Sequence, residues 1–279
     1  MFISNSHGFI FIHLHKCAGT SVEIALSATQ AWNDVLLGST AVGEYIQRGY
    51  QRQFGLYKHS CAARVHEVVG NEFWTRCFSF ATVRNPFAVA VSQYTFSISQ
   101  MQIALRKLKP APGGSAQTPS GGFAQAPSGG FAQAPSEGPE QRAQGVGNAR
   151  PQQPGRWPWE YPGVKALVSL GSERPTFSEF IRSPHLENWT GFGPMRPQLC
   201  DARGTLLVNE VIKLEDLAQR WPALCARLGV GELPLGRDNP SVRGKRDFRE
   251  YYANGRDVDH VRAVFAGDFE FFGYDDHLK

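Results

Sequence analysis

The stretch Gly8–Ser21, GFIFIHLHKCAGTS, contains the clearest fold signal in the sequence. Residues 8–14 form a short, nearly continuous apolar run rich in Ile and Phe, which is typical of a strand buried on both faces of a parallel sheet. A polar turn over His15–Gly19 follows. Residues 20–28 then place apolar side chains at helical spacing, with the Thr20–Ser21 pair available as the helix cap. The stretch therefore predicts a central strand, a tight loop and the start of a helix.

The alternation of strand and helix recurs along the chain. Residues 77–83, CFSFATV, predict a second strand, and Pro86 suits the first position of a helix that runs to Leu108, because its missing N–H would be unpaired there anyway. Further candidates are a strand over residues 205–214 and helices over residues 215–228 and 257–266. This order predicts an α/β fold with a P-loop-like parallel sheet flanked by helices.

A change in composition divides the chain. Residues 109–156 contain eight prolines, ten glycines and no Leu or Ile, and the octapeptide PSGGFAQA occurs at Pro119 and again at Pro127. Such a segment cannot bury enough apolar surface to offset the entropy lost on ordering, and its period is too short for a solenoid repeat. We expect a single domain over residues 1–279, interrupted by a disordered insertion at 109–156.

Composition and charge exclude several classes of protein. The chain of 279 residues is 42% hydrophobic and 19% charged, which excludes a wholly disordered or fibrous protein. Its net charge of +4 is too small to indicate a nucleic-acid partner. Five cysteines without a CxxC pair indicate neither a disulfide framework nor a zinc site, and they favour a reducing, cytoplasmic location. The apolar run Phe9–Leu14 is far short of the roughly 20 residues of a membrane span, and residues 1–8 lack the basic start of a signal peptide, so we expect neither element.

The loop after the first predicted strand has the composition of an anion site. Backbone amides at a helix N-terminus, together with the positive end of the helix dipole, suit a phosphate-like group. Lys16 adds a full charge, and Thr20 and Ser21 add hydroxyl donors. The lysine precedes the glycine, unlike the order in a Walker loop, which argues against a nucleoside triphosphatase. The alternative is a solvated lysine beside an ordinary helix cap.

Arg84 marks a second candidate site. It leaves a predicted buried strand just before a helix, where an arginine can clamp a phosphate, because ligands of open α/β sheets bind beyond the carboxyl ends of the strands. Ser92 lies about two turns into that helix and could face the same crevice. The alternative is an arginine paired with a surface carboxylate and a serine at a helix interface.

Together the two segments resemble one enzyme family. IFIHLHKCAGTS (residues 10–21) followed by FSFATVRNPFAVAVSQY (residues 78–94) resembles the 5′-phosphosulfate loop and the 3′-phosphate site of sulfotransferases that use 3′-phosphoadenosine-5′-phosphosulfate (PAPS), in particular the carbohydrate-modifying group that includes the heparan sulfate 2-O-sulfotransferases. VIKLEDLAQRWPALCARLGV, LPLGRDNPSVRGKRDFREYY and VRAVFAGDFEFFGY resemble the acidic-strand helix, basic loop and closing FGY of that family. The chain departs from the family at His15, where proline is usual, and in its Pro/Gly-rich insertion.

The resemblance implies a role for each candidate residue. Lys16 would be the cation at the leaving oxygen, and the loop would hold the 5′-phosphate and the sulfuryl group. Arg84 and Ser92 would hold the 3′-phosphate, and the basic run at residues 243–246 would either cover that phosphate or remain a solvated turn. The implied donor is PAPS, the implied acceptor is a hydroxyl of a carbohydrate or of another compound, and no metal is implied. The donor-binding residues are then Lys16, Cys17, Ala18, Gly19, Thr20, Ser21, Arg84, Ser92, Arg243, Lys245 and Arg246.

His59 is the candidate general base. The resemblance places it where relatives have a histidine ahead of the second phosphate strand, and an imidazole titrates near neutral pH, as a base for a sugar hydroxyl should. Its alternative role is one structural hydrogen bond in a loop. Glu210 and Glu215 are carboxylate alternatives, and His15 adjoins the phosphate loop, where a positive neighbour would make it a poor base.

Two other functions remain open at this point. An atypical kinase lacks support, because the sequence has neither GxxxxGK[ST] nor an evident carboxylate for Mg²⁺ after a strand. A nucleotide-binding or scaffold protein on a degenerate sulfotransferase fold is the non-enzyme alternative. The joint presence of Lys16, Arg84 and Ser92 disfavours it.

Overall fold

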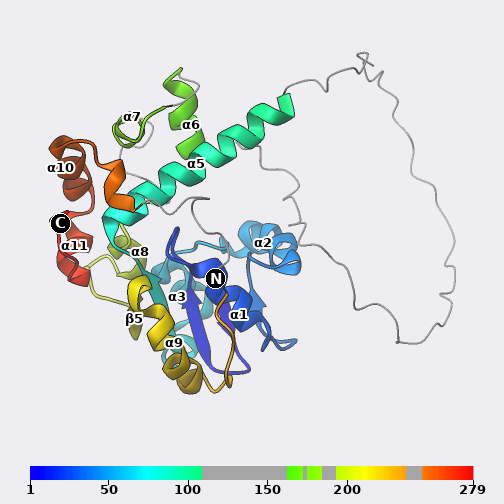
Figure 1. Ribbon diagram of the computed structural model, residues 1–279. Helices are drawn as coiled ribbons and strands as arrows, with labels where there is room; N and C mark the ends of the chain where they lie inside the picture. The colour runs from blue at the N-terminus through cyan, green and yellow to red at the C-terminus, as the bar shows by residue number, and fades with distance from the viewer. Residues whose placement is uncertain (109–161, 172–174, 184–192, 237–246, 279) are drawn as a thin grey trace, which may run out of the picture.

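The computed structural model describes residues 1–108, 162–171, 175–183, 193–236 and 247–278 (Figure 1). Strands are concentrated in the first third of the chain, and runs of consecutive helices separate β3, β4 and β5. In chain order they are β1 (Phe2–Ser4), β2 (Phe9–Ile12), α1 (Gly19–Ser27), β3 (Val35–Leu36), α2 (Ala41–Phe54), α3 (Ala62–Val69), α4 (Asn71–Arg76), β4 (Phe78–Val83), α5 (Pro86–Leu108), α6 (Pro162–Ser169), α7 (Phe177–Ile181), α8 (Arg196–Leu199), β5 (Glu210–Lys213), α9 (Leu214–Leu228), the 3-10 helix η3 (Phe248–Tyr251), α10 (Gly255–Val264) and α11 (Ala266–Phe272).

The strands form one open five-stranded sheet in the order β3-β1-β2-β4-β5. β2, β4 and β5 are mutually parallel, with Phe11 paired to Phe80 and Val83 paired to Lys213. β1 runs antiparallel to both β2 and β3. The expected α/β class and the central place of the first apolar run are confirmed. The expectation of an entirely parallel sheet is wrong. A tight turn at residues 5–8 connects β1 to β2, and so short a connection permits only antiparallel pairing.

Alternate side chains of β2 enter two different cores. Phe9 and Phe11 pack with apolar side chains of α1 and α9. Ile10 and Ile12 belong to the core on the other face, which α5 and the C-terminal helices complete. The sheet is therefore buried on both sides between layers of helices, and each fully buried Phe or Ile contributes about 1.5–3 kcal/mol to stability.

Most predicted boundaries lie within two residues of the observed ones. The helix that begins with Pro86 and ends at Leu108 is confirmed as α5, and the strand predicted at 77–83 is β4. The strand predicted at 205–214 is shortened to β5, because residues 201–205 form a turn with Gly204 at φ +82°. β1 and β3 escaped prediction, since two or three residues show no periodicity.

The remaining expectations concern the segment 109–156 and membrane crossing. The predicted disordered insertion lies outside the described residues. Over the part of the chain that the structure covers, no helix combines the length and the apolar character that a membrane crossing requires.

Candidate functional site

The loop between β2 and α1 has a strained backbone. Lys16 and Ala18 adopt φ values of 62° and 61°, a left-handed conformation that side chains other than glycine rarely take. Ala18 is the N-cap of α1, and no side chain caps this helix among the described residues. The expectation that Thr20 or Ser21 caps the helix is therefore wrong, because α1 already begins at Gly19. The loop instead leaves amide donors at the positive end of the helix, which suits an anion.

The carboxyl ends of β2 and β4 meet at this loop. The two strands are adjacent and parallel, so the residues after them emerge at the same edge of the sheet. Thr82 Oγ1 donates a hydrogen bond of 2.6 Å to the carbonyl oxygen of Cys17. Arg84 Nη1 donates a longer one of 3.4 Å to the carbonyl oxygen of Lys16. The structure thus brings together the two predicted cations, which are 68 residues apart in the chain.

Lys16 is partly buried, and its Nζ lies 4.2 Å from the centroid of the Phe96 ring on α5. Burial, with a further contribution from the Arg84 cation, lowers the pKa of Lys16 to about 8. No ion pair joins Lys16 or Arg84 to a carboxylate of the described residues. Two cations that repel each other beside a helix N-terminus would both be stabilised by a bound anion.

A network from three elements holds the turn that follows Arg84. Glu215, at the start of α9, accepts hydrogen bonds from the backbone N–H of Asn85 at 2.9 Å and from the Tyr274 hydroxyl at 2.9 Å. The Asn85 side chain in turn accepts from the N–H of Phe87 at 2.9 Å, at the start of α5. Arg84 therefore leaves β4 from a turn that α9 and the C-terminal segment brace.

His59 lies against the same loop. Its Nδ1 is 3.0 Å from the carbonyl oxygen of His13, and its ring stacks on His15 with 3.5 Å between ring centroids and 26° between ring planes. A carbonyl oxygen only accepts, so Nδ1 carries the hydrogen and Nε2 of the neutral ring keeps a lone pair. Burial, followed by the neighbouring His15, lowers the pKa of His59 well below 6.5.

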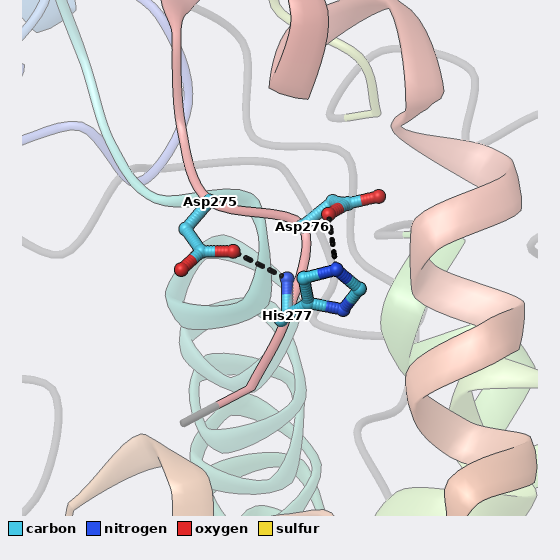
Figure 2. A group of neighbouring side chains, drawn as sticks. All are labelled: Asp275, Asp276 and His277. Carbon is cyan, nitrogen blue, oxygen red and sulfur yellow. Dashed lines mark hydrogen bonds and ion pairs between the residues drawn. The ribbon is translucent and has the colours of Figure 1, made fainter.

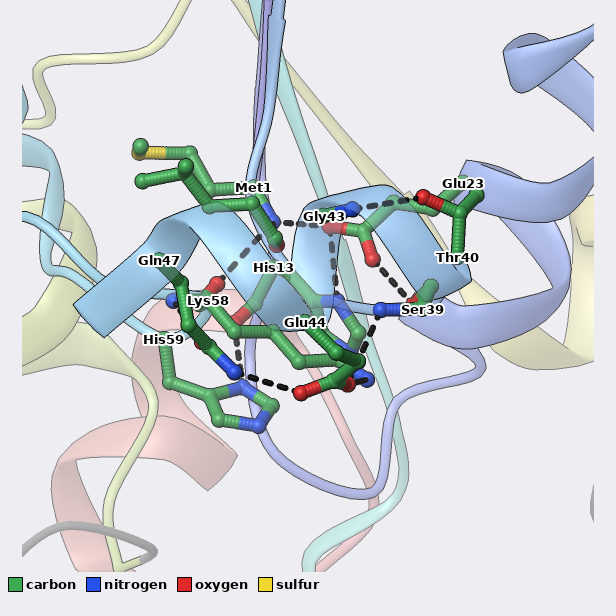
Figure 3. A network of polar contacts seen from close by, with 11 residues as sticks. Met1, His13, Glu23, Ser39, Thr40, Gly43, Glu44, Gln47, Lys58 and His59 are labelled. Carbon is green, nitrogen blue, oxygen red and sulfur yellow. Dashed lines mark hydrogen bonds and ion pairs between the residues drawn. The ribbon is translucent and has the colours of Figure 1, made fainter. Parts of the chain in front are cut away.

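His13 supports the loop from within the core (Figure 3). A Cβ on Gly19 would lie 2.1 Å from His13 Cδ2, so the imidazole fills the space that any other residue at this position would need. His13 Nδ1 is 2.9 Å from Glu23 Oε1, without the alignment of a hydrogen bond. The same carboxylate contacts the amino group of Met1 and the hydroxyl of Ser39. His13 is buried directly after β2, and burial lowers its pKa well below 6.5.

The site so far combines an uncapped helix N-terminus, two converging cations and a tautomerically fixed imidazole. No protein-family model, curated protein or solved structure matches this chain. The chemistry must therefore be argued from these groups. Together they can hold a doubly charged, phosphate-like group and accept a proton beside it.

The structure places the other predicted donor-binding residues differently. Ser92 is buried on α5 one turn before Phe96, so both side chains lie on the helix face that Lys16 approaches, although no hydrogen bond joins Ser92 to Lys16 or Arg84. The Cys17 thiol is buried, and burial raises its pKa to about 12, so only the backbone of Cys17 is available to a ligand. Arg243, Lys245 and Arg246 lie outside the described residues.

The alternative bases are engaged elsewhere. Glu210 begins β5, at the opposite end of the strand from the loop, and pairs with Arg220 at 2.5 Å and Arg227 at 3.2 Å. Both carboxylate oxygens of Glu215 already accept hydrogen bonds. Of the candidates, His59 and His15 are the ones that lie at the loop.

Asp275, Asp276 and His277 form a group with metal-binding atom types near the C-terminal end (Figure 2). Asp275 and His277 are exposed, and Asp275 Oδ1 accepts the His277 N–H at 2.9 Å. The Asp276 carboxylate is 3.6 Å from Arg262 Nε. A cation already faces this group, and we assign it no ligand.

Proposed function

We propose that this protein is a PAPS-dependent sulfotransferase on a P-loop-like fold, which transfers a sulfuryl group to a hydroxyl of a carbohydrate. The observation that carries the proposal is the convergence of Lys16 and Arg84 on the uncapped N-terminus of α1, with His59 held beside them. The donor bears a 5′-phosphosulfate and a 3′-phosphate, so Lys16 would face the first group and Arg84 the second. The five free cysteines support a reducing compartment such as the cytoplasm.

The reaction needs charge stabilisation and a base. The acceptor oxygen attacks sulfur in line, and the bond between sulfur and the bridging oxygen of the 5′-phosphate breaks. Negative charge then accumulates on the bridging oxygen, which leaves as part of adenosine 3′,5′-bisphosphate. Lys16 and the amides of the loop would stabilise that charge. The acceptor proton would pass to Nε2 of His59, because Nδ1 is committed to the carbonyl of His13.

Binding of adenosine 3′,5′-bisphosphate tests the phosphate assignments. Calorimetry should show binding roughly ten- to a hundredfold tighter than that of AMP, since the Arg84 guanidinium would engage a phosphate that AMP lacks, and one charge-assisted contact is worth about 1.5–3 kcal/mol. Arg84→Gln should remove most of this preference. Arg256→Gln, at an exposed position on α10, is the matched control and should keep it. Equal affinities for the two nucleotides in the wild-type protein would discard the 3′-phosphate site.

Activity separates the enzyme from a binding protein. Incubation with radiolabelled PAPS and a panel of polysaccharide acceptors should yield a labelled sulfate ester and one equivalent of adenosine 3′,5′-bisphosphate. Tight nucleotide binding without transfer to any acceptor would instead support the nucleotide-binding scaffold. Transfer of a phosphoryl group from ATP would support the kinase.

A further inference from the structure

Three imidazoles meet beside the loop between β2 and α1. His15 stacks on His59 face to face, and His13 meets the same ring edge-on, with 4.5 Å between centroids and 80° between planes. His13 and His15 both follow the end of β2, whereas His59 comes from the segment between α2 and α3. The sequence gives no sign of this contact, because the three residues share no motif.

The stack of His15 on His59 limits the tilt of the His59 ring, which the hydrogen bond to the His13 carbonyl leaves free. The bond from Nδ1 to the His13 carbonyl fixes the position of the His59 ring edge, but the ring could still tilt about it. The His15 ring, 3.5 Å away, covers one face and limits that tilt. The direction in which Nε2 points is therefore set by two contacts from the β2 side.

The charges around His59 favour its neutral form. His13 and His15 are its neighbours on the β2 side, and Lys16 directly follows His15 in the chain. On its own segment, Lys58 directly precedes His59. The nearby carboxylates are committed elsewhere, Glu23 to the contacts of His13 and Met1 and Glu44 to Lys58 at 3.6 Å (Figure 3). A charge on His15 would lie directly against the His59 ring, so the two stacked rings resist simultaneous protonation.

We propose that His15 is a positioning residue for His59, which orients its ring and keeps it neutral so that Nε2 can receive the acceptor proton. The proposal rests on the proposed function in one respect, namely that His59 is the base. His15 itself need not touch the substrate, because its contribution passes through the stacked ring. A phenylalanine at this position would keep the stack and remove the second titratable group, whereas an alanine would remove both.

The experiment compares His15→Phe and His15→Ala with His277→Phe, the same substitution at an exposed histidine. NMR titration of the His59 ring should show its midpoint raised by about half a pH unit or more in both His15 variants and unchanged in the control. At saturating substrates and pH 8, His15→Phe should retain turnover within about threefold, while His15→Ala should lose about tenfold. The affinity for adenosine 3′,5′-bisphosphate should stay within about twofold throughout.

Two results would overturn the proposal. Wild-type turnover and an unshifted His59 midpoint in His15→Ala would show that the stack does nothing for His59. An equal loss of turnover and nucleotide affinity would assign His15 to the loop itself. Failure of the proposed function looks different, because the NMR titration requires no turnover. If the wild-type protein transfers no sulfuryl group but the His59 midpoint still shifts in the His15 variants, the enzyme is rejected and the coupling of the two rings stands.

Discussion

Lys16 combines three unfavourable features at one residue. Its backbone lies in the left-handed region, its ammonium is partly buried, and the Arg84 cation disfavours its charged form. Strain of this kind costs of order 1–3 kcal/mol and persists where the surrounding structure enforces it. Here Thr82 holds the next carbonyl of the loop, and His13 fills the space beneath Gly19. The fold therefore maintains an electrostatically unfavourable arrangement that a bound anion would relieve.

Nucleotide binding should accordingly be linked to a proton at Lys16. The pKa of Lys16 in the free protein is about 8, below its usual 10.5, so above pH 8 the amine loses its charge. A bound phosphate favours the charged form and raises this pKa, which means that binding takes up a proton near pH 8.5 and weakens as the pH rises further. Calorimetry in two buffers with different ionisation enthalpies measures the uptake. It should vanish in Lys16→Gln, and uptake that persists in this variant would assign the proton to another group.

Turnover should depend on His59 without a change in donor binding. His59→Ala should lower turnover by about two to four orders of magnitude, because it removes the proton acceptor, while calorimetry gives an unchanged affinity for adenosine 3′,5′-bisphosphate. Since the pKa of His59 lies well below 6.5, the wild-type rate should be flat near neutral pH and fall only in acid. A variant rate within about threefold of wild type, at saturating donor and acceptor, would exclude His59 as the base and leave His15 as the remaining candidate at the loop.

The site residues could be predicted only where a recognisable sequence pattern precedes them. Lys16 and Arg84 directly follow apolar strands, and parallel strands deliver such residues to one edge. The same logic cannot find the packing of His13 against Gly19 or the ring of Phe96 beneath Lys16, because these contacts arise through space. His59 was reached through a family resemblance, and its stack on His15 has no counterpart in any sequence pattern.

At the level of elements, the turn that follows Arg84 depends on three segments. Asn85 belongs to the β4–α5 turn, Glu215 to α9 and Tyr274 to the segment after α11. Burial, with the nearby Glu215 carboxylate, raises the pKa of Tyr274, so its hydroxyl is a donor at any ordinary pH. The C-terminal segment thus helps to fix the direction in which Arg84 leaves the sheet.

Tyr274→Phe should loosen this brace. Loss of the hydroxyl removes one hydrogen bond worth about 1 kcal/mol, so the affinity for adenosine 3′,5′-bisphosphate should fall roughly three- to tenfold, while binding of AMP, which lacks the 3′-phosphate, should change little. Calorimetry with both nucleotides gives the two numbers. Tyr45→Phe, at a highly exposed position on α2, is the control. Equal losses for both nucleotides would show that the brace supports the whole site rather than Arg84.

The mixed sheet shows why element order alone gave an incomplete topology. β2, β4 and β5 are each followed by a helix, and the expected parallel pairing holds among them. β1 and β3 extend the sheet on the other side of β2 with two or three residues each. Their pairing is set by the short turn and by Met1, whose carbonyl accepts from Leu37 at 2.9 Å, and neither feature has a periodic signature.

At the scale of the whole molecule, the Pro/Gly-rich segment joins two helices that already pack together. α6 packs against α5, and a Cβ on Gly163 would come within 2.0 Å of Ser97 Oγ, so the start of α6 sits against the middle of α5 (Figure 1). Leu108, the last residue of α5, is 11 residues beyond Ser97, or about 16 Å along the helix. A connection therefore has to span only about this distance.

Deletion of residues 111–155 should leave the fold and the site intact. Two residues before the cut and six after it remain, and eight extended residues reach about 26 Å, so a short Gly/Ser joint suffices. The removed segment contains no Leu or Ile to lose from the core. Shortening the loop also lowers the entropic cost of closing it by about 1 kcal/mol, which favours the folded state. The melting temperature should stay level or rise by a few degrees, with nucleotide affinity unchanged. A drop of more than a few degrees that a longer joint does not restore would show that the segment supplies contacts to the core, and loss of transfer with nucleotide affinity intact would place it at the acceptor side of the site.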